Sequence, residues 1–191
     1  MSDASKAMVE NAKAAYRRIN QQLRAGNLSA ALALFKVIPK EFDSLQELAF
    51  NRPITAVHLV FECLKAGNLT QARQLFEAMA QLGNAPEMVL LRTEVAHNLM
   101  IDYIRAGNLS EARALLEAMA QLGDAPETAA LRDEATHNLI IGYLCAGNFL
   151  EAQKLFASMA VPDSRQKPRE RWGEYSRSFI STFQKNQLFK T

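Results

Sequence analysis

The sequence predicts an all-α fold, an α-α solenoid of about three to four stacked helix pairs that ends in a C-terminal capping helix. The tripeptide Ala-Gly-Asn begins at Ala25, Ala66, Ala106 and Ala146, a spacing of 40 or 41 residues. Repetition at such a period is typical of stacked helical units. Residues 66–105 and 106–145 are identical at 25 of 40 positions, so we expect these units to share one structure.

Each unit is predicted to contain a short helix followed by a long one. Asn108 stands where the N-cap of the short helix is expected, and the helix runs over about 109–122. Asp124 is the predicted N-cap of the long helix, and Pro126 lies in its first turn, where a missing N–H removes no hydrogen bond. The long helix extends to about Cys145, and the preceding unit repeats this pattern.

The two ends of the chain depart from the repeat. Pro53 predicts a break or a kink at a point where the later long helices continue. We assign residues 1–160 to the helical repeats, 161–171 to a basic loop that contains proline, and 172–191 to an amphipathic helix that caps the last repeat. The predicted apolar side of this last helix consists of Trp172, Tyr175, Phe179, Ile180 and Phe183.

Composition and charge argue against several classes of protein. The chain has 22 basic and 20 acidic residues, a net charge of +2, so no strong field indicates nucleic acid or an anionic membrane. Cys63 and Cys145 lack the spacing of a disulfide scaffold or a zinc module, and both are expected to be small buried hydrophobes. No apolar stretch reaches the roughly 18 to 20 residues of a membrane span, and the N-terminus lacks the apolar run of a signal peptide. We therefore expect a cytoplasmic protein with no membrane partner.

The stretch from His137 to Ala160 resembles a tetratricopeptide repeat, and it resembles the related pentatricopeptide repeat at least as closely. The family's packing positions are matched without gaps by Leu139, Tyr143, Gly147, Ala152, Phe156 and Met159. The segments LIIGYLCAG, EAQKLFASM and AMAQLGDAPE are similar to the sequence pattern of pentatricopeptide repeats. The resemblance covers about residues 5–160, although the period of 40 exceeds the roughly 34 residues of a tetratricopeptide repeat.

The resemblance implies a right-handed superhelix whose long helices line a concave groove. Such a groove binds a peptide or, in pentatricopeptide proteins, single-stranded RNA at one base per repeat. Two columns of residues counted back from each repeated glycine are the candidate groove residues. They are Tyr16, Val57, His97 and His137 at ten residues before the glycine, and Arg17, His58, Asn98 and Asn138 at nine. The alternative for Asn98 and Asn138 is that they hydrogen-bond neighbouring helices.

A third column holds three cations two residues before the glycine. Its members are Arg24, Lys65 and Arg105, and Cys145 interrupts it in the last repeat. By resemblance to pentatricopeptide proteins these cations are candidate phosphate contacts. The alternative is that they favour the last turn of a helix, where positive charge is stabilising.

The first functional hypothesis is a binding module without enzymatic activity: an adaptor, scaffold or chaperone that holds a segment of a partner protein in the groove. The alternative is a pentatricopeptide-like protein that binds single-stranded RNA, against which the near-neutral charge and the large side chains of His97 and His137 count. The sequence gives no indication of catalysis, because it shows neither a Gly-rich phosphate-binding loop after a strand nor a cysteine with an organised histidine partner. His97 and His137 are equivalent residues of adjacent repeats, roughly 10 Å apart or more, and do not suit one shared metal. We expect no metal and no cofactor.

Overall fold

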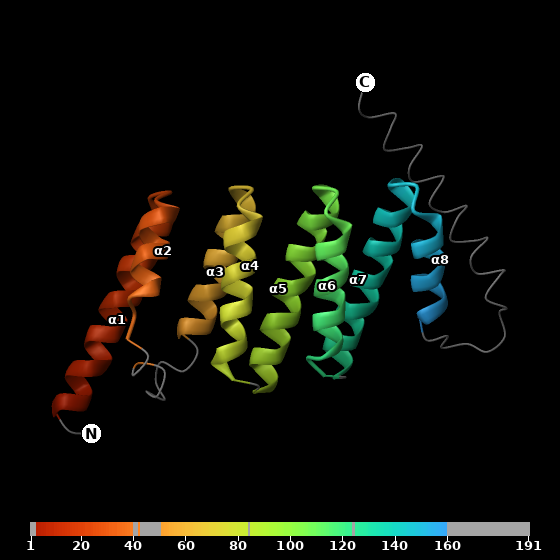
Figure 1. The fold of residues 1–191 in the computed structure, drawn as a ribbon. Helices are drawn as coiled ribbons and strands as arrows, with labels where there is room; N and C mark the ends of the chain where they lie inside the picture. The colour runs from red at the N-terminus through yellow and green to blue at the C-terminus, as the bar shows by residue number, and fades with distance from the viewer. Residues whose placement is uncertain (1–2, 40–41, 43–50, 84, 124, 160–191) are drawn as a thin grey trace.

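The computed structural model describes residues 3–39, 42, 51–83, 85–123 and 125–159, which form α-helices and no strand. The helices follow one another in antiparallel pairs along a single axis (Figure 1). Their bounds are α1 Asp3–Arg24, α2 Leu28–Lys36, α3 Asn51–Lys65, α4 Leu69–Met79, α5 Pro86–Arg105, α6 Leu109–Ala120, α7 Pro126–Cys145 and α8 Phe149–Ser158, with a 3-10 turn, η3 Ala80–Leu82, after α4. The predicted all-α solenoid is confirmed, with four helix pairs in the described part of the chain.

Each Ala-Gly-Asn tripeptide is the turn inside a pair, and its glycine is required by the backbone. Gly107 has a φ of 76°, and the N–H of Asn108 donates to the carbonyl oxygen of Tyr103 at 2.8 Å. This hydrogen bond across six residues closes a helix end through a residue in the left-handed region, which glycine adopts without steric cost. The glycines of the other three tripeptides also have positive φ, so the repeated motif is explained by the repeated turn.

The helices α4, α6 and α7 start within a residue of the predicted positions, but not all of their N-caps form as the sequence predicts. The Oδ1 atom of Asn68 accepts a hydrogen bond from the N–H of Gln71 at 3.1 Å, whereas Asn108 caps α6 without a side-chain bond. The long helix α7 begins at Pro126 with Ala125 as its N-cap. The predicted N-cap at Asp124 is therefore one residue too early, because Pro126 occupies the first helical position itself; Asp124 lies outside the described residues.

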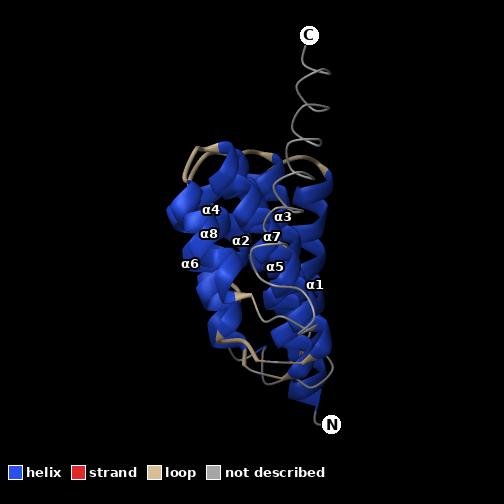
Figure 2. Ribbon diagram, turned by 90° about the vertical axis from the view of Figure 1, so that its right-hand side faces the viewer, coloured by secondary structure: helices blue, strands red, loops and turns tan. Residues whose placement is uncertain are grey.

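Two layers make up the stack (Figure 2). The long helices α1, α3, α5 and α7 pack side by side. Each short helix packs against its own long helix, and α2, α4 and α6 also pack against the next long helix. Small residues permit this close approach: Ala31, Ala72, Ala112 and Ala152 stand at equivalent positions of the short helices, and all are fully buried. Opposite them the long helices bury Leu59, Leu99 and Leu139 completely.

The long helices are not evenly spaced. α5 and α7 approach each other along more of their length than the described parts of α1 and α3 or of α3 and α5 do. Gly142 on α7 explains the tight contact, since a Cβ atom built there would lie 2.8 Å from Cγ2 of Ile104 and 3.1 Å from Cδ2 of Leu109. The first three long helices are left further apart along one face.

The remaining sequence predictions concern the first connection and the chain ends. The described part of α3 runs from Asn51 to Lys65 and includes Pro53. The equivalent position in α5 is Thr93, in mid-helix; residues 43–50, where a break before Pro53 would fall, lie outside the described residues. The predicted loop 161–171 and capping helix 172–191 lie outside the described residues. None of the described helices combines the length and the hydropathy needed to cross a membrane.

Candidate functional site

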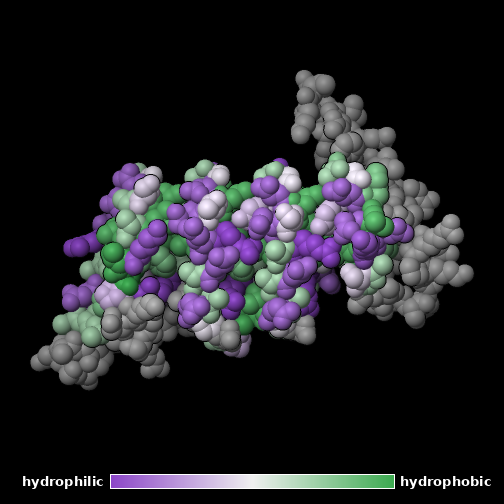
Figure 3. Space-filling model, viewed as in Figure 1, coloured by the Kyte–Doolittle hydropathy of each residue, from purple (hydrophilic) through white to green (hydrophobic). Residues whose placement is uncertain are grey.

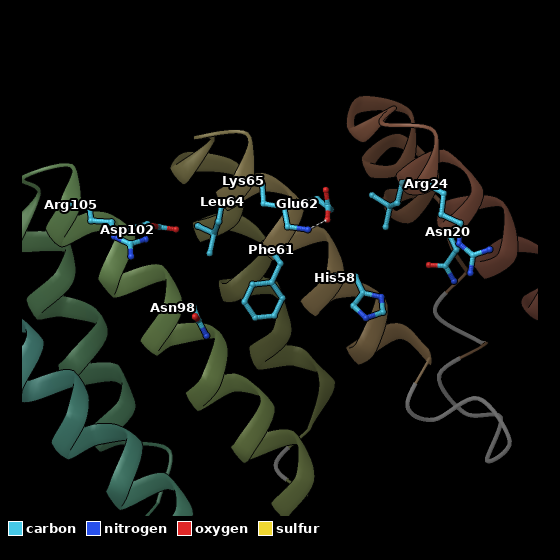
Figure 4. Close-up of a pocket in the computed structure, with 11 residues that line it drawn as sticks. Asn20, Arg24, His58, Phe61, Glu62, Leu64, Lys65, Asn98, Asp102 and Arg105 are labelled. Carbon is cyan, nitrogen blue, oxygen red and sulfur yellow. Dashed lines mark hydrogen bonds and ion pairs between the residues drawn. The ribbon is translucent and has the colours of Figure 1, made fainter. Parts of the chain in front are cut away.

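A hollow of about 800 Å³ runs across α1, α3 and α5 where these helices are spaced apart (Figure 4). Its lining consists of Asn20, Leu23 and Arg24 from α1, His58, Phe61, Glu62, Leu64 and Lys65 from α3, and Asn98, Asp102 and Arg105 from α5. These residues stand nine, six, five, three and two positions before the repeated glycines. Such positions share one face of an α-helix, so the repeat itself brings them together. We refer to this site as the hollow.

All three predicted phosphate contacts line the hollow. Arg24, Lys65 and Arg105 lie in the last turns of successive long helices and line the hollow together. Lys65 pairs with Glu62, and the Nη1 atom of Arg105 lies 2.9 Å from Oδ1 of Asp102. Arg24 makes no ion pair with a described residue, because Gln21 stands where the other two helices have a carboxylate. The hollow therefore carries three cations and two carboxylates.

The column nine residues before the glycine is divided between the hollow and helix packing. His58 and Asn98 line the hollow. Arg17 lies in a smaller depression between α1 and α3, which His58 also lines. Asn138 instead faces α5, with its Nδ2 atom 3.4 Å from Nε2 of His97. For Asn138 the structure thus shows the alternative of a contact between neighbouring helices.

The column ten residues before the glycine lies largely within the packing. Tyr16, Val57 and His97 are buried, and Tyr16 reaches the edge of the smaller depression. His137 is exposed, and its Nδ1 atom lies 3.0 Å from the carbonyl oxygen of Asp133 in the same helix. The burial of Tyr16, Val57 and His97 follows from helix geometry. Each of them precedes a residue of the nine-residue column by one position, and this step turns the side chain by about 100° around the helix axis, toward the neighbouring helices.

Sequence reasoning missed the aromatic part of the hollow. Phe61 is half-buried and lines the hollow, but the equivalent residues in the other repeats are Asn20, Ile101 and Ile141. Isoleucine in two of four repeats indicates core packing, which hid the column. Glu62 and Asp102 could have been found from their spacing of three residues before the cations.

The last repeat does not extend the hollow. At the positions of Glu62 and Lys65, α7 has Gly142 and Cys145. Gly142 lets α7 close against α5, and Cys145 supplies no charge. Cys145 is exposed, which corrects the expectation that both cysteines are buried; Cys63 is buried as expected. Cys145 differs because it lies in the last turn of α7, where the other repeats carry their exposed cations.

The described residues hold no cluster of three or more His, Cys, Asp or Glu side chains suited to a metal ion. The hollow is lined by cations, carboxylates, amides and the ring of Phe61. Stacked helix pairs with such a face define a helical-repeat solenoid, a class of binding modules.

Comparison with known families agrees with this class. The pentatricopeptide repeat (PPR repeat) model matches residues 95–124 and 137–161, and the interval between the two stretches is the beginning of α7. The matched stretches lie in the third and fourth helix pairs, and together with the all-helical stack they are consistent with a helical repeat similar to the tetratricopeptide and pentatricopeptide repeats. Comparison with curated proteins and with solved structures gives no match.

Proposed function

We propose that the hollow binds single-stranded RNA. The observation that carries this proposal is the row formed by Arg24, Lys65 and Arg105, which lies at repeat spacing beside the ring of Phe61. Proteins that bind single strands combine a basic groove along the backbone with aromatic side chains for the bases. The pentatricopeptide match supports the same assignment, and for this reason we place RNA ahead of the protein partner that the sequence alone favoured.

The two carboxylates in the hollow do not prevent phosphate binding. The side chains of Lys65 and Arg105 are 71% and 75% exposed. Exposed pairs three residues apart on a helix contribute about 0.3–0.5 kcal/mol, so a phosphate can replace the carboxylate at low cost. Arg24 has no carboxylate to exchange and can meet a phosphate directly.

Charge-neutral variants test the proposal. Arg24→Gln, Lys65→Gln and Arg105→Gln are titrated with fluorescently labelled single-stranded RNA, and anisotropy is measured at several salt concentrations. Each variant should bind more weakly and reduce the salt slope by about 0.7. Lys36→Gln is the matched control, because Lys36 is an exposed cation in the last turn of α2 outside the hollow. Absence of RNA binding, or equal losses with the control, contradicts the proposal.

A peptide segment is the second candidate occupant. Leu23 and Leu64 add apolar area to the hollow, and the amides of Asn20 and Asn98 can bond an extended backbone. In that case panning a displayed peptide library on the chain should enrich one motif. Binding of that motif should be lost with Asn98→Ala and should depend little on salt.

A further inference from the structure

We propose that Phe61 is a stacking platform for one unpaired base, so that the hollow holds a single stacked nucleotide between flanking phosphates. This inference rests on the proposed RNA function and specifies how the hollow recognises its ligand. Among the four equivalent residues of the long helices, Phe61 is the aromatic one; the others are asparagine or isoleucine. The stack therefore occurs at the second helix pair and is not repeated along the solenoid.

The surroundings of Phe61 leave its ring accessible. The ring lies in the hollow between the side chains of His58, one turn earlier on α3, and Asn98 from α5 (Figure 4). Its inner edge packs against the core while the residue stays half-buried. A base needs one such planar apolar surface, and stacking on it does not depend on the base's identity.

The cations have the right arrangement for a nucleotide on this platform. Arg24 on α1 and Arg105 on α5 lie on opposite sides of α3, and Lys65 stands one turn after Phe61 on α3 itself. A strand that crosses the three helices can place a phosphate near each outer cation and one base on Phe61. The spacing between α5 and α7 closes beyond this point, because Gly142 fits directly against Ile104. The hollow thus accommodates a short segment.

The volume of the hollow agrees with such a ligand. About 800 Å³ lies within the range of roughly 300–1,000 Å³ found for sites of small ligands. The carboxylates of Glu62 and Asp102 lie at the level of the last turn, beside the cations, and away from the floor where the base would stack.

The experiment compares two probes on the full chain: an eight-nucleotide oligoadenylate, and an abasic oligomer of the same length that keeps the ribose phosphates. Wild-type protein should bind the oligoadenylate about 10- to 100-fold more tightly than the abasic probe. Phe61→Leu keeps the apolar contact with the core but removes the planar surface. It should bind both probes with the weak affinity of the abasic oligomer, while Phe61→Trp keeps the preference.

Phe156→Leu is the matched control, because Phe156 is also half-buried but lies on α8 outside the hollow. It should bind like the wild type. If Phe61→Leu binds oligoadenylate as tightly as the wild type while the cation variants lose affinity, stacking is wrong and the RNA function stands. If the wild type binds neither probe, both proposals fall. Should Phe61→Leu not fold, the ratio of the two probes on wild type and on Phe61→Trp decides the question.

Discussion

Gly142 sets the spacing of the last two long helices through the absence of a side chain. A Cβ atom at this position would approach Cγ2 of Ile104 to 2.8 Å, and a β-branched methyl group cannot rotate away freely. Alanine normally stabilises a helix interior by about 1 kcal/mol relative to glycine. Here overpacking costs about 1–3 kcal/mol, so we expect Gly142→Ala to lower the free energy of unfolding by about 1 kcal/mol in urea denaturation.

The double variant Gly142→Ala with Ile104→Leu is the control, since leucine has no Cγ2 branch at the clash. The loss caused by Gly142→Ala should be smaller in the Ile104→Leu background than in wild type, and the coupling energy from both single variants and the double variant measures the contact. A single variant that is more stable than wild type would show that α7 can move away from α5 without cost.

The two cysteines should differ sharply in reactivity. Burial raises the pKa of the Cys63 thiol, and the nearby charge of Glu62 raises it further, so little thiolate forms near neutral pH. Cys145 is exposed in the last turn of α7. Native protein should therefore be alkylated by iodoacetamide at one thiol per chain, and Cys145→Ser should remove the reaction. Labelling of Cys63 at a comparable rate in the native protein would contradict its buried position.

Among the elements, the short helices offer a matched pair of N-caps. Asn68 bonds the N–H of Gln71, whereas Asn108 makes no cap bond from its side chain. Asn68→Ala should therefore lower the free energy of unfolding by about 1 kcal/mol. Asn108→Ala should cost distinctly less, and chemical denaturation of both variants checks the order. Equal losses would mean that the asparagines act through the turn conformation.

Ion pairs link neighbouring short helices, and many hydrophilic residues lie on the face of the stack that Figure 3 shows. The guanidinium of Arg73 lies 3.9 Å from Glu111 of the next pair, and that of Arg113 lies 3.1 Å from Glu151 of the pair after. The two contacts join equivalent positions of successive repeats. They connect α4, α6 and α8 along the stack.

The free energy of unfolding should depend on pH through the ionisation of the Glu151 carboxyl group. A hydrogen bond from Lys154, with the charges of Lys154 and Arg113, holds the pKa of Glu151 below its ordinary value of 4.5. A depressed carboxyl pKa stabilises the fold above the unfolded value, and the stabilisation is lost as pH falls through the folded value. Glu151→Gln should thus lower the urea midpoint at neutral pH, and the difference should shrink as the pH falls below 4.5 and through the lowered pKa of Glu151.

At the scale of the whole molecule, the sequence predicted architecture far better than the site. Repeated glycines and prolines act through local backbone geometry, so the four turns and the starts of α5 and α7 were found to within a residue. The hollow depends on the distances between α1, α3, α5 and α7, which no single repeat encodes. Counting back from the glycines found His58, Asn98 and the three cations, but it placed Tyr16, Val57 and His97 with them although these are buried. Phe61 was missed because its column contains isoleucines.

The C-terminal end of the stack leaves apolar surface uncovered in the described residues. Phe149 and Leu150 on α8 are 65% and 64% exposed. In the preceding repeat, the equivalent of Phe149 is Leu109, which packs near Gly142 of the next long helix. No further repeat follows α8 among the described residues, so this apolar surface lacks the partner that Leu109 has. Residues 161–191 carry seven basic and three acidic residues, and α7 with α8 carries four acidic and two basic ones.

We therefore expect residues 172–191 to cover this end, as the sequence predicts, and a chain truncated after residue 160 to aggregate or to melt at a markedly lower temperature. The aromatic residues of the predicted stripe each contribute on the order of 2 kcal/mol when buried, and their removal leaves α8 bare. Light scattering and thermal denaturation of the truncated and full chains measure the effect. Adding Phe149→Ser and Leu150→Ser to the truncated chain should make it monodisperse again, because the exposed apolar surface is removed. The melting temperature should stay low, because the lost contacts are not replaced. A truncated chain that stays monodisperse with an unchanged melting temperature would show that residues 161–191 are a separate segment and that Phe149 and Leu150 face another partner.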